Sequence, residues 1–526
     1  MGCPLLDSRN LTSALVIVLL SSGPISLLGQ AVVGKSLGSG TGPRADGSRQ
    51  GTAADSRSDS MVAGESCSRR GRRVGSEEDL QLEPRQQAPL LKRMWQNSQV
   101  DASPDTRPAP TQPPGSGSKG RPLRWLDFGL EHRSRYEAYD KNFRKDLPGS
   151  DQQLAQRTRV WVGVNTHNRP LGFLVELEDA RVHATDARFR TNSSYVNTLD
   201  FLQMRLDINL QNLLAGGPPA SIEVGRLTMD FGNRRLIARN RFRNTTNTFD
   251  GVLWSLGKED SRQLRGFAVK PVRRETHRLD RFDPPTWFWG LEAGDHRRSA
   301  FRIEIYYFGL HGRTPNSDLI RRFTTLGGRL FKDPALGAFH YEVESAWQFG
   351  ENASLDHFAH FQHLQGGYTF RSNWVPVLEG LFDYASGDRD PTDSKSGQFV
   401  PLFGSRRSEL GPTGIWGPFS RSNSLGPGYR LTLSPSKNVR VGAAHRAWWL
   451  AQARDEWVGS GFRDPEGQSG RFLGNQVESW VQWLASDHLL FETGVAHLQK
   501  GRFARSLPDS PTNHSTYFYA ATELHF

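Results

Sequence analysis

Six arginines lie in one stretch of the chain, residues 222–254, whose two ends are apolar and strand-like. Between these ends, residues 230–247 are too charged to form a core and, with Leu236 and Ile237, too apolar for a simple linker. Arginine at this density is typical of a surface that binds anions or nucleic acid. The commoner interpretation is a solvated loop. The fold that carries the flanking strands must decide between the two.

A second group of candidate ligands opens a long loop at residues 386–426. Asp388, Asp390 and Asp393 lie near its start, and carboxylate oxygens at close spacing are the ligands of a hard cation such as Ca²⁺. A solvated loop is the commoner interpretation, so we expect no cofactor otherwise. The cysteines, Cys3 and Cys67, offer neither a disulfide framework nor a metal cluster.

Catalysis is the competing class of function. An enzyme of the nucleophile type needs a nucleophile, a base and an orienting group close together. The carboxylates of this chain are scattered along it without an evident acid–base pair, and His445 falls on the apolar face of its segment. We therefore expect a protein that is not an enzyme.

The composition is basic and aromatic. The 526 residues include 66 Lys and Arg against 55 Asp and Glu, a net charge of +11, with 30 Phe, 14 Trp and 11 Tyr. A mean hydropathy of −0.58 is usual for a soluble protein. Transmembrane β-barrels have similar values, because polar residues occupy every second position of their strands.

The N-terminal region divides into two expected segments. Arg9 precedes an apolar run that ends in small residues at Gly29 and Ala31, so residues 1–31 are predicted to be a signal peptide, with a membrane anchor as the alternative. Residues 32–120 are rich in Gly, Ser, Pro and Arg and are predicted to be a disordered tail. Residues 121–526 form the expected folded domain, and no further apolar run is long enough for a spanning helix.

Period-two alternation begins near residue 124 and continues to the last residue. Leu126, Phe128 and Leu130 alternate with polar residues, which indicates a strand with one apolar and one charged face. The pattern recurs at residues 160–164, 202–211, 301–308, 339–344, 439–444 and 476–483. At the C-terminus, Phe518 and Phe526 lie on one face, which is typical of a closing barrel strand that the barrel-assembly machinery recognises; a soluble β-sandwich edge is the alternative.

Short turns alternate with longer polar loops along this region. The loops are expected near residues 140–153, 185–198, 230–247, 272–285, 310–321, 350–359, 386–426, 454–473 and 501–515. Eight turns between nine loops predict an all-β fold, a single transmembrane antiparallel β-barrel of about 18 strands in the cell outer membrane. Weak patterning at residues 262–271 and 286–294 leaves 16 strands as the alternative.

A barrel of this size can enclose an aqueous channel, whose selectivity depends on the lumenal side chains. The charged faces carry Arg133, Arg135, Arg157, Arg159, Arg205, Arg302, Arg440 and Arg446. They also carry Asp127, Glu131, Glu176, Asp207, Glu304, Glu342, Glu344 and Glu478. These charges either form cross-strand ion-pair ladders or leave a surplus of arginine that favours anionic solutes.

The region from residue 124 to residue 526 resembles the alginate export family of outer-membrane porins. The resemblance rests on residues 157–164, 173–182, 224–252, 384–404, 444–457 and 474–503, of which 224–252 (VGRLTMDFGNRRLIARNRFRNTTNTFDGV) and 384–404 (YASGDRDPTDSKSGQFVPLFG) are the most specific. It implies a monomeric barrel of eighteen strands that secretes a linear anionic polysaccharide through an arginine-lined constriction. Two features depart from the family: the lumen has more acid than an alginate pore needs, and the N-terminal tail lies outside the family domain.

The resemblance and the charged faces together give the predicted pore residues. They are Arg133, Arg135, Arg157, Arg159, Arg226, Arg235, Arg239 and Arg446. Arg226 falls in phase with the apolar Ile222 and Val224, so it reaches the pore only if a β-bulge turns it inward. Loops 386–426 and 454–473 could plug the bore.

The predicted function is passive export of an anionic polysaccharide or oligosaccharide. The expected partners are that solute, outer-membrane lipid and the assembly machinery, and a membrane barrel removes nucleic acid from the list. The alternatives are a porin of general or different selectivity, or a structural or adhesive barrel without transport.

Overall fold

The computed structural model describes residues 125–526, except residues 146, 148, 166–169, 186–191, 211–216, 283–284, 299, 314–318, 509 and 511–512. The predicted signal peptide and disordered tail, residues 1–120, lie outside the described residues. Within the described residues, no helix combines the length and the apolar character that a membrane crossing requires.

Twenty strands form one sheet, and two of them, β8 (Arg281–Phe282) and β15 (Lys395–Ser396), have only two residues each. The other strands are β1 (Leu126–Asp140), β2 (Asp151–Val164), β3 (Leu171–His183), β4 (Asn197–Asn209), β5 (Ala220–Leu227), β6 (Phe249–Gly257), β7 (Arg262–Arg273), β9 (Trp287–Asp295), β10 (Arg302–Arg313), β11 (Ile320–Lys332), β12 (Ala338–Asn352), β13 (Leu355–Thr369), β14 (Val377–Ala385), β16 (Ser424–Ser436), β17 (Val439–Trp449), β18 (Phe472–Ser486), β19 (Leu489–Lys500) and β20 (Ser515–His525). Two short helices, α4 (Arg407–Leu410) and α5 (Arg502–Ser506), lie in loops.

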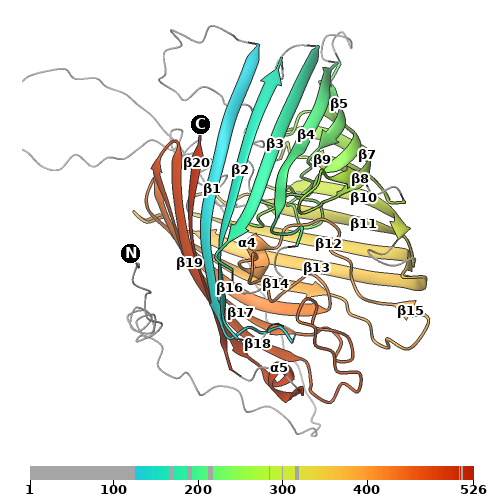
Figure 1. The fold of residues 1–526 in the computed structure, drawn as a ribbon, viewed down its shortest axis with the longest axis vertical. Helices are drawn as coiled ribbons and strands as arrows, with labels where there is room; N and C mark the ends of the chain where they lie inside the picture. Colours follow the sequence, from blue (N-terminus) through green and yellow to red (C-terminus); the bar gives the residue numbers. More distant parts are fainter. Residues whose placement is uncertain are drawn as a thin grey trace, which may run out of the picture. The chain divides into compact units, whose positions relative to one another are not determined.

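The wall closes between its first and last strands (Figure 1). β1 pairs with β20 in antiparallel register from Glu131↔His525 to Asp140↔Thr516. The prediction of an antiparallel barrel of eighteen strands is confirmed. The two weakly patterned segments form β7 and β9, so the alternative of sixteen strands is wrong.

The two faces of the wall follow the predicted alternation. On β1, Phe128 is 74% exposed to the outside, whereas Glu131 and Arg133 are buried inside at 3% and 4%. On β12, Phe339 points outward with 72% exposure and Glu342 inward with 8%. Apolar side chains therefore cover the outer face because it meets lipid, and the charged side chains line the lumen.

The expected long loop near residues 350–359 is absent, which corrects that prediction. Ala353 and Ser354 alone connect β12 to β13, with positive φ values of 54° and 62°. Positive φ at both central residues is the geometry of a tight hairpin turn. The polar residues around the turn belong to the ends of β12 and β13, so their polarity does not mark a loop.

Two loops fold into the bore. Loop A is residues 230–247, between β5 and β6, and loop B is residues 386–423, between β14 and β16. They meet as a short bridge in which the amide of Phe403 donates to the carbonyl of Leu236 at 2.9 Å. Gly404 lies at their closest approach, where a Cβ atom would be 1.7 Å from the carbonyl oxygen of Arg235. Only glycine fits there.

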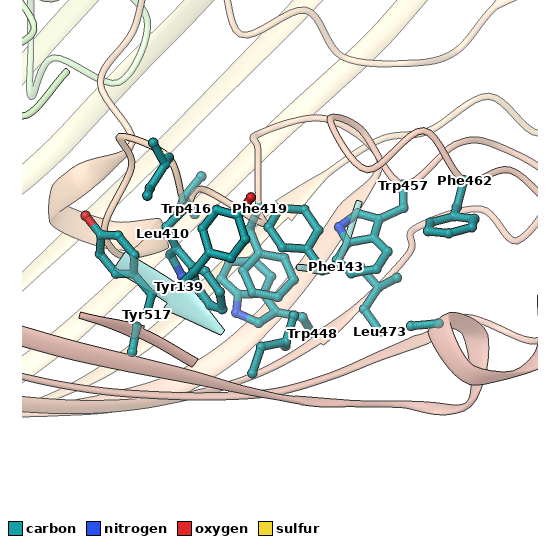
Figure 2. Packing of buried hydrophobic residues seen from close by; sticks show 14 of the residues in the cluster. Tyr139, Phe143, Leu410, Trp416, Phe419, Trp448, Trp457, Phe462, Leu473 and Tyr517 are labelled. Atoms are coloured by element: carbon teal, nitrogen blue, oxygen red, sulfur yellow. The ribbon is translucent and has the colours of Figure 1, made fainter. Parts of the chain in front are cut away.

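Two apolar clusters form between these loops and the wall. In the first, Phe231 and Ile237 of loop A and Phe399 of loop B pack on inward side chains of β6–β14. In the second, Trp416 and Phe419 of loop B pack on inward aromatic residues of β1, β17 and β20, together with residues of neighbouring loops (Figure 2). The lumen thus contains a packed interior, whereas the sequence predicted a water-filled bore with loops 386–426 and 454–473 as candidate plugs. Loop B corresponds to the first of these candidates, and loop A is a plug that was not among them.

Candidate functional site: the lumenal arginines

Three of the predicted arginines, Arg133, Arg157 and Arg159, point into the lumen from β1 and β2. Arg133 and Arg157 face each other directly across the two strands. Glu131 balances one side of this group, 2.6 Å from Arg157 and 3.4 Å from Arg159. Glu178 lies 2.9 Å from Arg159.

The same wall arginines hold the backbone of loop A. Arg157 donates to the carbonyl oxygens of Arg241 and Arg243 at 2.8 and 3.3 Å. Arg133 donates to the same two carbonyls and, at 3.1 Å, to Oδ1 of Asn244. Guanidinium groups that look like solute ligands in the sequence therefore act here as donors to a folded loop.

Arg135 lies next along β1 and has both a carboxylate and an aromatic partner. Its guanidinium lies 3.1 Å from Glu137 and 4.2 Å from the ring centroid of Phe242. It also donates to the carbonyl of Phe242. Arg135 is 1% exposed, so it joins wall and loop within a dry contact.

Arg235 of loop A occupies the centre of an ionic node. It pairs with Glu342 and Glu344 of the wall, the latter at 2.5 Å. Its other partner is Glu409 of α4 in loop B, also at 2.5 Å. Although burial raises it, the pKa of Glu409 falls to about 2 because Arg235 and Arg421 stabilise its charge. One carboxylate thus connects the two loops.

Arg239 and Arg446 are also neutralised. Arg239 makes a two-pronged contact with Glu176 on β3, at 2.6 and 3.1 Å. Arg446 on β17 lies 2.6 Å from Asp383 and donates to the carbonyl of Glu409 at 2.8 Å. Each guanidinium therefore already has the counterion that a solute carboxylate would supply.

Arg226 does not lie with the lumenal arginines. The register of β5 with β4 and β6 is regular through this position, so no bulge turns its side chain inward. It pairs across the sheet with Met204, which is 46% exposed on the outer face. Its guanidinium lies 2.8 Å from Asp250, and this correction removes Arg226 from the candidate pore.

Six arginines, on β1, in loop A and in three other loops, have no carboxylate oxygen within 4.0 Å of their guanidinium nitrogens among the described residues. They are Arg133, Arg144, Arg241, Arg243, Arg274 and Arg406, and we call them the uncompensated arginines. Their hydrogen bonds go to neutral acceptors: Arg243 and Arg274, for example, both donate to Oδ1 of Asn247, at 2.6 and 2.7 Å.

Burial lowers the pKa of Arg241 and that of Arg406 to about 10, which leaves both charged at neutral pH. Burial and the neighbouring guanidinium of Arg274 hold the pKa of Arg243 well below its usual range. Of these six residues the sequence singled out Arg133. The arginine density of residues 230–247 pointed to Arg241 and Arg243, but nothing in the sequence connects Arg144, Arg274 and Arg406, which come from three other loops.

Known proteins resemble this chain in family and in fold. The family model described as "Alginate export" matches residues 124–518. The chain belongs to the alginate export family. This family is one of outer-membrane channels, so the protein is a β-barrel of the cell outer membrane. No curated protein matches the chain by sequence.

Solved barrels share the fold of this alginate export family member at low sequence identity. OccD3 (OpdP) of Pseudomonas aeruginosa superposes with a TM-score of 0.53 at 9% identity, over 77% of this chain and 92% of that chain. OccK3 (OpdO) of the same organism gives 0.51 at 12%, over 76% and 95%. OccAB1 of Acinetobacter baumannii gives 0.51 at 8%, over 76% and 96%. Identity this low supports the fold alone.

The aspartates predicted as a Ca²⁺ site accept local hydrogen bonds, and the Ca²⁺ site stays a prediction. Oδ1 of Asp390 accepts hydrogen bonds from the backbone and hydroxyl of Thr392, and Asp388 and Asp393 cap neighbouring backbone amides. Among the described residues, three potential ligand atoms come within 4.8 Å of one another elsewhere, at His363, Asp383 and Glu409. Arginines already neutralise both carboxylates of that group.

Proposed function

We propose that the barrel passes an anionic polysaccharide or oligosaccharide by passive diffusion, and that the uncompensated arginines attract it. The single observation that carries this proposal is their lack of carboxylate partners inside a family of export channels. A uronate carboxylate supplies the missing counterion, and the planar guanidinium fork binds it in bidentate fashion.

The neutralised arginines suit this role less well. Breaking a buried ion pair costs about 3–5 kcal/mol, because one charge is left without a partner in a dry site. A solute that bound Arg157 or Arg239 would have to displace Glu131 or Glu176 first. Of the predicted pore residues, we therefore keep Arg133, which has no carboxylate partner among the described residues, as a solute contact that becomes available when loop A moves. We add Arg241 and Arg243. We assign Arg135, Arg157, Arg159, Arg235, Arg239 and Arg446 to holding the lumenal loops.

Passage of a chain-like solute requires space that loops A and B occupy. Their polar contacts with each other and with the wall include the Glu409–Arg235 node and the donors of β1 and β2. We therefore propose that the channel is closed at rest and opens when the two loops move.

Single-channel recording in planar bilayers tests the substrate class. We expect oligouronate added on the loop side to block the current, and a neutral oligosaccharide of equal length to block it far less. Arg241→Gln combined with Arg243→Gln should weaken the oligouronate block by roughly tenfold, the loss of about 1.4 kcal/mol. Arg181→Gln, on the outer face beside Asp179, is the control and should leave the block unchanged. Equal block by both sugars would contradict the proposal.

The packed lumen supports one alternative, a structural or adhesive barrel without transport. Absence of conductance in the same bilayers, under voltage and after acidification, would favour it. A porin of general or different selectivity would instead conduct with equal block by neutral and anionic sugars.

We further propose that the barrel is a monomer assembled through its last strand. Phe526 is 68% exposed on the outer face, and its backbone exchanges hydrogen bonds with Leu130 of β1 at 2.9 and 3.1 Å. An outward terminal aromatic residue beside the seam supports recognition by the assembly machinery.

A further inference from the structure

Four of the uncompensated arginines form one group among the loops. Arg243 and Arg274 both donate to Oδ1 of Asn247, at 2.6 and 2.7 Å, so their guanidinium groups are close neighbours. Burial, followed by the charges of Arg274 and Arg406, holds the pKa of Arg243 well below its usual range. Burial, followed by the charge of Arg144, lowers the pKa of Arg406. We call these four arginines the loop cluster.

The loop cluster connects separate loops through neutral acceptors. Nε of Arg274 donates at 3.0 Å to the carbonyl of Ser193, in the loop between β3 and β4. Nη1 of Arg144 donates at 3.0 Å to the carbonyl of Ile415 in loop B, and its Nε donates at 3.2 Å to that of Gly459, in the loop between β17 and β18. The groups that hold these loops together therefore carry like charges, which repel one another.

Three members of the loop cluster have donors that make no hydrogen bond within the described part of the chain. These donors are Nη1 of Arg243, Nη2 of Arg274, and Nε and Nη2 of Arg406, and each is open to solvent. The three side chains are half-buried. A partly dehydrated guanidinium with open donors can bind an oxyanion from solution.

The carboxylates whose charges reach the loop cluster, Glu178 and Asp280, already have partners. Glu178 lies 2.9 Å from Arg159, and Asp280 accepts a hydrogen bond from Nδ2 of Asn197 at 3.0 Å. Among the described residues, neither carboxylate has an oxygen within 4.0 Å of a guanidinium nitrogen of the cluster. The cluster thus lacks a counterion in direct contact.

We propose that the loop cluster binds a free divalent tetrahedral oxyanion, such as sulfate or phosphate, at Arg243, Arg274 and Arg406, and that this anion holds the loops closed. Such an anion has four oxygens and accepts from three guanidinium groups at once, whereas chloride carries one charge and no planar pair of acceptors. An anion that binds the closed loops alone stabilises them by mass action. The closing role rests on the proposed gating by loop movement; the binding itself does not.

Isothermal titration calorimetry of the full chain in detergent tests the binding. Sodium sulfate is the probe, because its charge is the same across the working pH range, and sodium chloride keeps the ionic strength constant. We expect wild type to bind sulfate and the variant Arg243→Gln with Arg274→Gln to lose at least about tenfold in affinity. The control Arg463→Gln removes a loop arginine that has a carboxylate partner, Asp455 at 3.3 Å, and should bind like wild type. Absence of binding to wild type, or equal affinity of the double variant, would overturn the proposal.

Asn247→Asp gives the loop cluster a carboxylate of its own. The new oxygen replaces the amide oxygen that accepts from Arg243 and Arg274, so the variant should unfold at a higher temperature without sulfate and bind sulfate more weakly than wild type. This variant also keeps the test decisive if the double variant gives no folded barrel in a heat-shift gel assay. Lower thermal stability of Asn247→Asp, or sulfate binding equal to that of wild type, would contradict the site.

Bilayer recording tests the closing role. Sulfate added on the loop side at constant ionic strength should lower the open probability of wild type and leave that of the double variant unchanged. An open probability of wild type that does not respond to sulfate would overturn the closing role. Block by oligouronate is a separate measurement: its absence would contradict the proposed substrate class, whereas sulfate binding in the calorimeter would still support this site.

Discussion

At the scale of single residues, Arg133 and Arg157 illustrate how much of the lumen the sequence could reveal. Period-two alternation predicted that both face inward, and they do. Like charges directly opposite each other destabilise a sheet unless they have partners. The partners are Glu131 and the backbone of loop A at Arg241 and Arg243, which is remote in sequence. No pattern local to β1 or β2 could indicate that contact.

The face on which Arg226 lies depends on the register of β5 with its neighbouring strands. The sequence left open a bulge at this position, and a one-residue shift moves a side chain to the other face. The register irregularities of this part of the wall lie instead between β3 and β4, at Glu176/Leu177 and Glu178/Ala180. A bulge in the neighbouring strand pair leaves β5 regular, so Arg226 remains outside.

Arg235→Ala is the sharpest test of the ionic node. The substitution leaves Glu342, Glu344 and Glu409 with one fewer shared cation, which we expect to cost about 3–5 kcal/mol of the contact between loops and wall. Channel openings should become more frequent, and the reversal potential in a KCl gradient should shift toward cation selectivity. The control Arg262→Ala removes an exposed arginine at the first residue of β7, which is far from loop A in the sequence. An unchanged conductance and reversal potential would contradict the role of the node.

At the scale of elements, the strands and the candidate plug at loop B were predictable, whereas the inward fold of loop A was not. Alternation depends on a local property, the contrast between lipid and lumen, so even the weakly patterned β7 and β9 have the predicted positions. Loop A folds inward because Leu236 and Ile237 pack with Phe403 of loop B, a contact between distant segments. The two apolar residues in an otherwise charged loop were the signal available in the sequence.

Acidification tests the connection between α4 and loop A. The folded-state pKa of Glu409 is about 2 against an ordinary value of 4.5, because Arg235 and Arg421 outweigh the effect of burial. A lowered pKa means that the carboxylate stabilises the closed loops fully above about pH 4.5 and loses this effect as the pH falls through about 2. Open probability in bilayers should therefore stay constant from pH 7 to 4.5 and rise toward pH 2.

The substitution Glu409→Gln removes the charge of this side chain at neutral pH. This variant should open at pH 7 as often as wild type does near pH 2, because the amide side chain no longer carries the charge that holds Arg235 and Arg421. Its own opening should depend little on pH over the range where wild type changes. A variant that stays closed at pH 7 would show that Glu409 does not hold the loops.

At the scale of the whole molecule, the seam between β1 and β20 completes the barrel. A substitution of Phe526 tests whether this residue acts in assembly of the barrel or in its stability once folded. Its side chain lies outside the packed interior at 68% exposure, so Phe526→Ser should change the stability of the folded barrel little. Assembly in cells should nevertheless fall several-fold, as measured by the heat-shifted folded band in outer-membrane fractions. Refolding from urea into detergent should proceed as in wild type. A matching loss in both assays would assign Phe526 a structural role.

The loop side chains that stack on the seam help to hold the barrel closed. Trp416 of loop B stacks on Tyr517 of β20 at 5.6 Å, and Phe242 of loop A meets Tyr519 edge-on at 5.2 Å. On the other side of the seam, Arg133 and Arg135 of β1 hold the backbone of loop A. Contacts on both sides of the seam make the two loops an internal template that holds the first and last strands together.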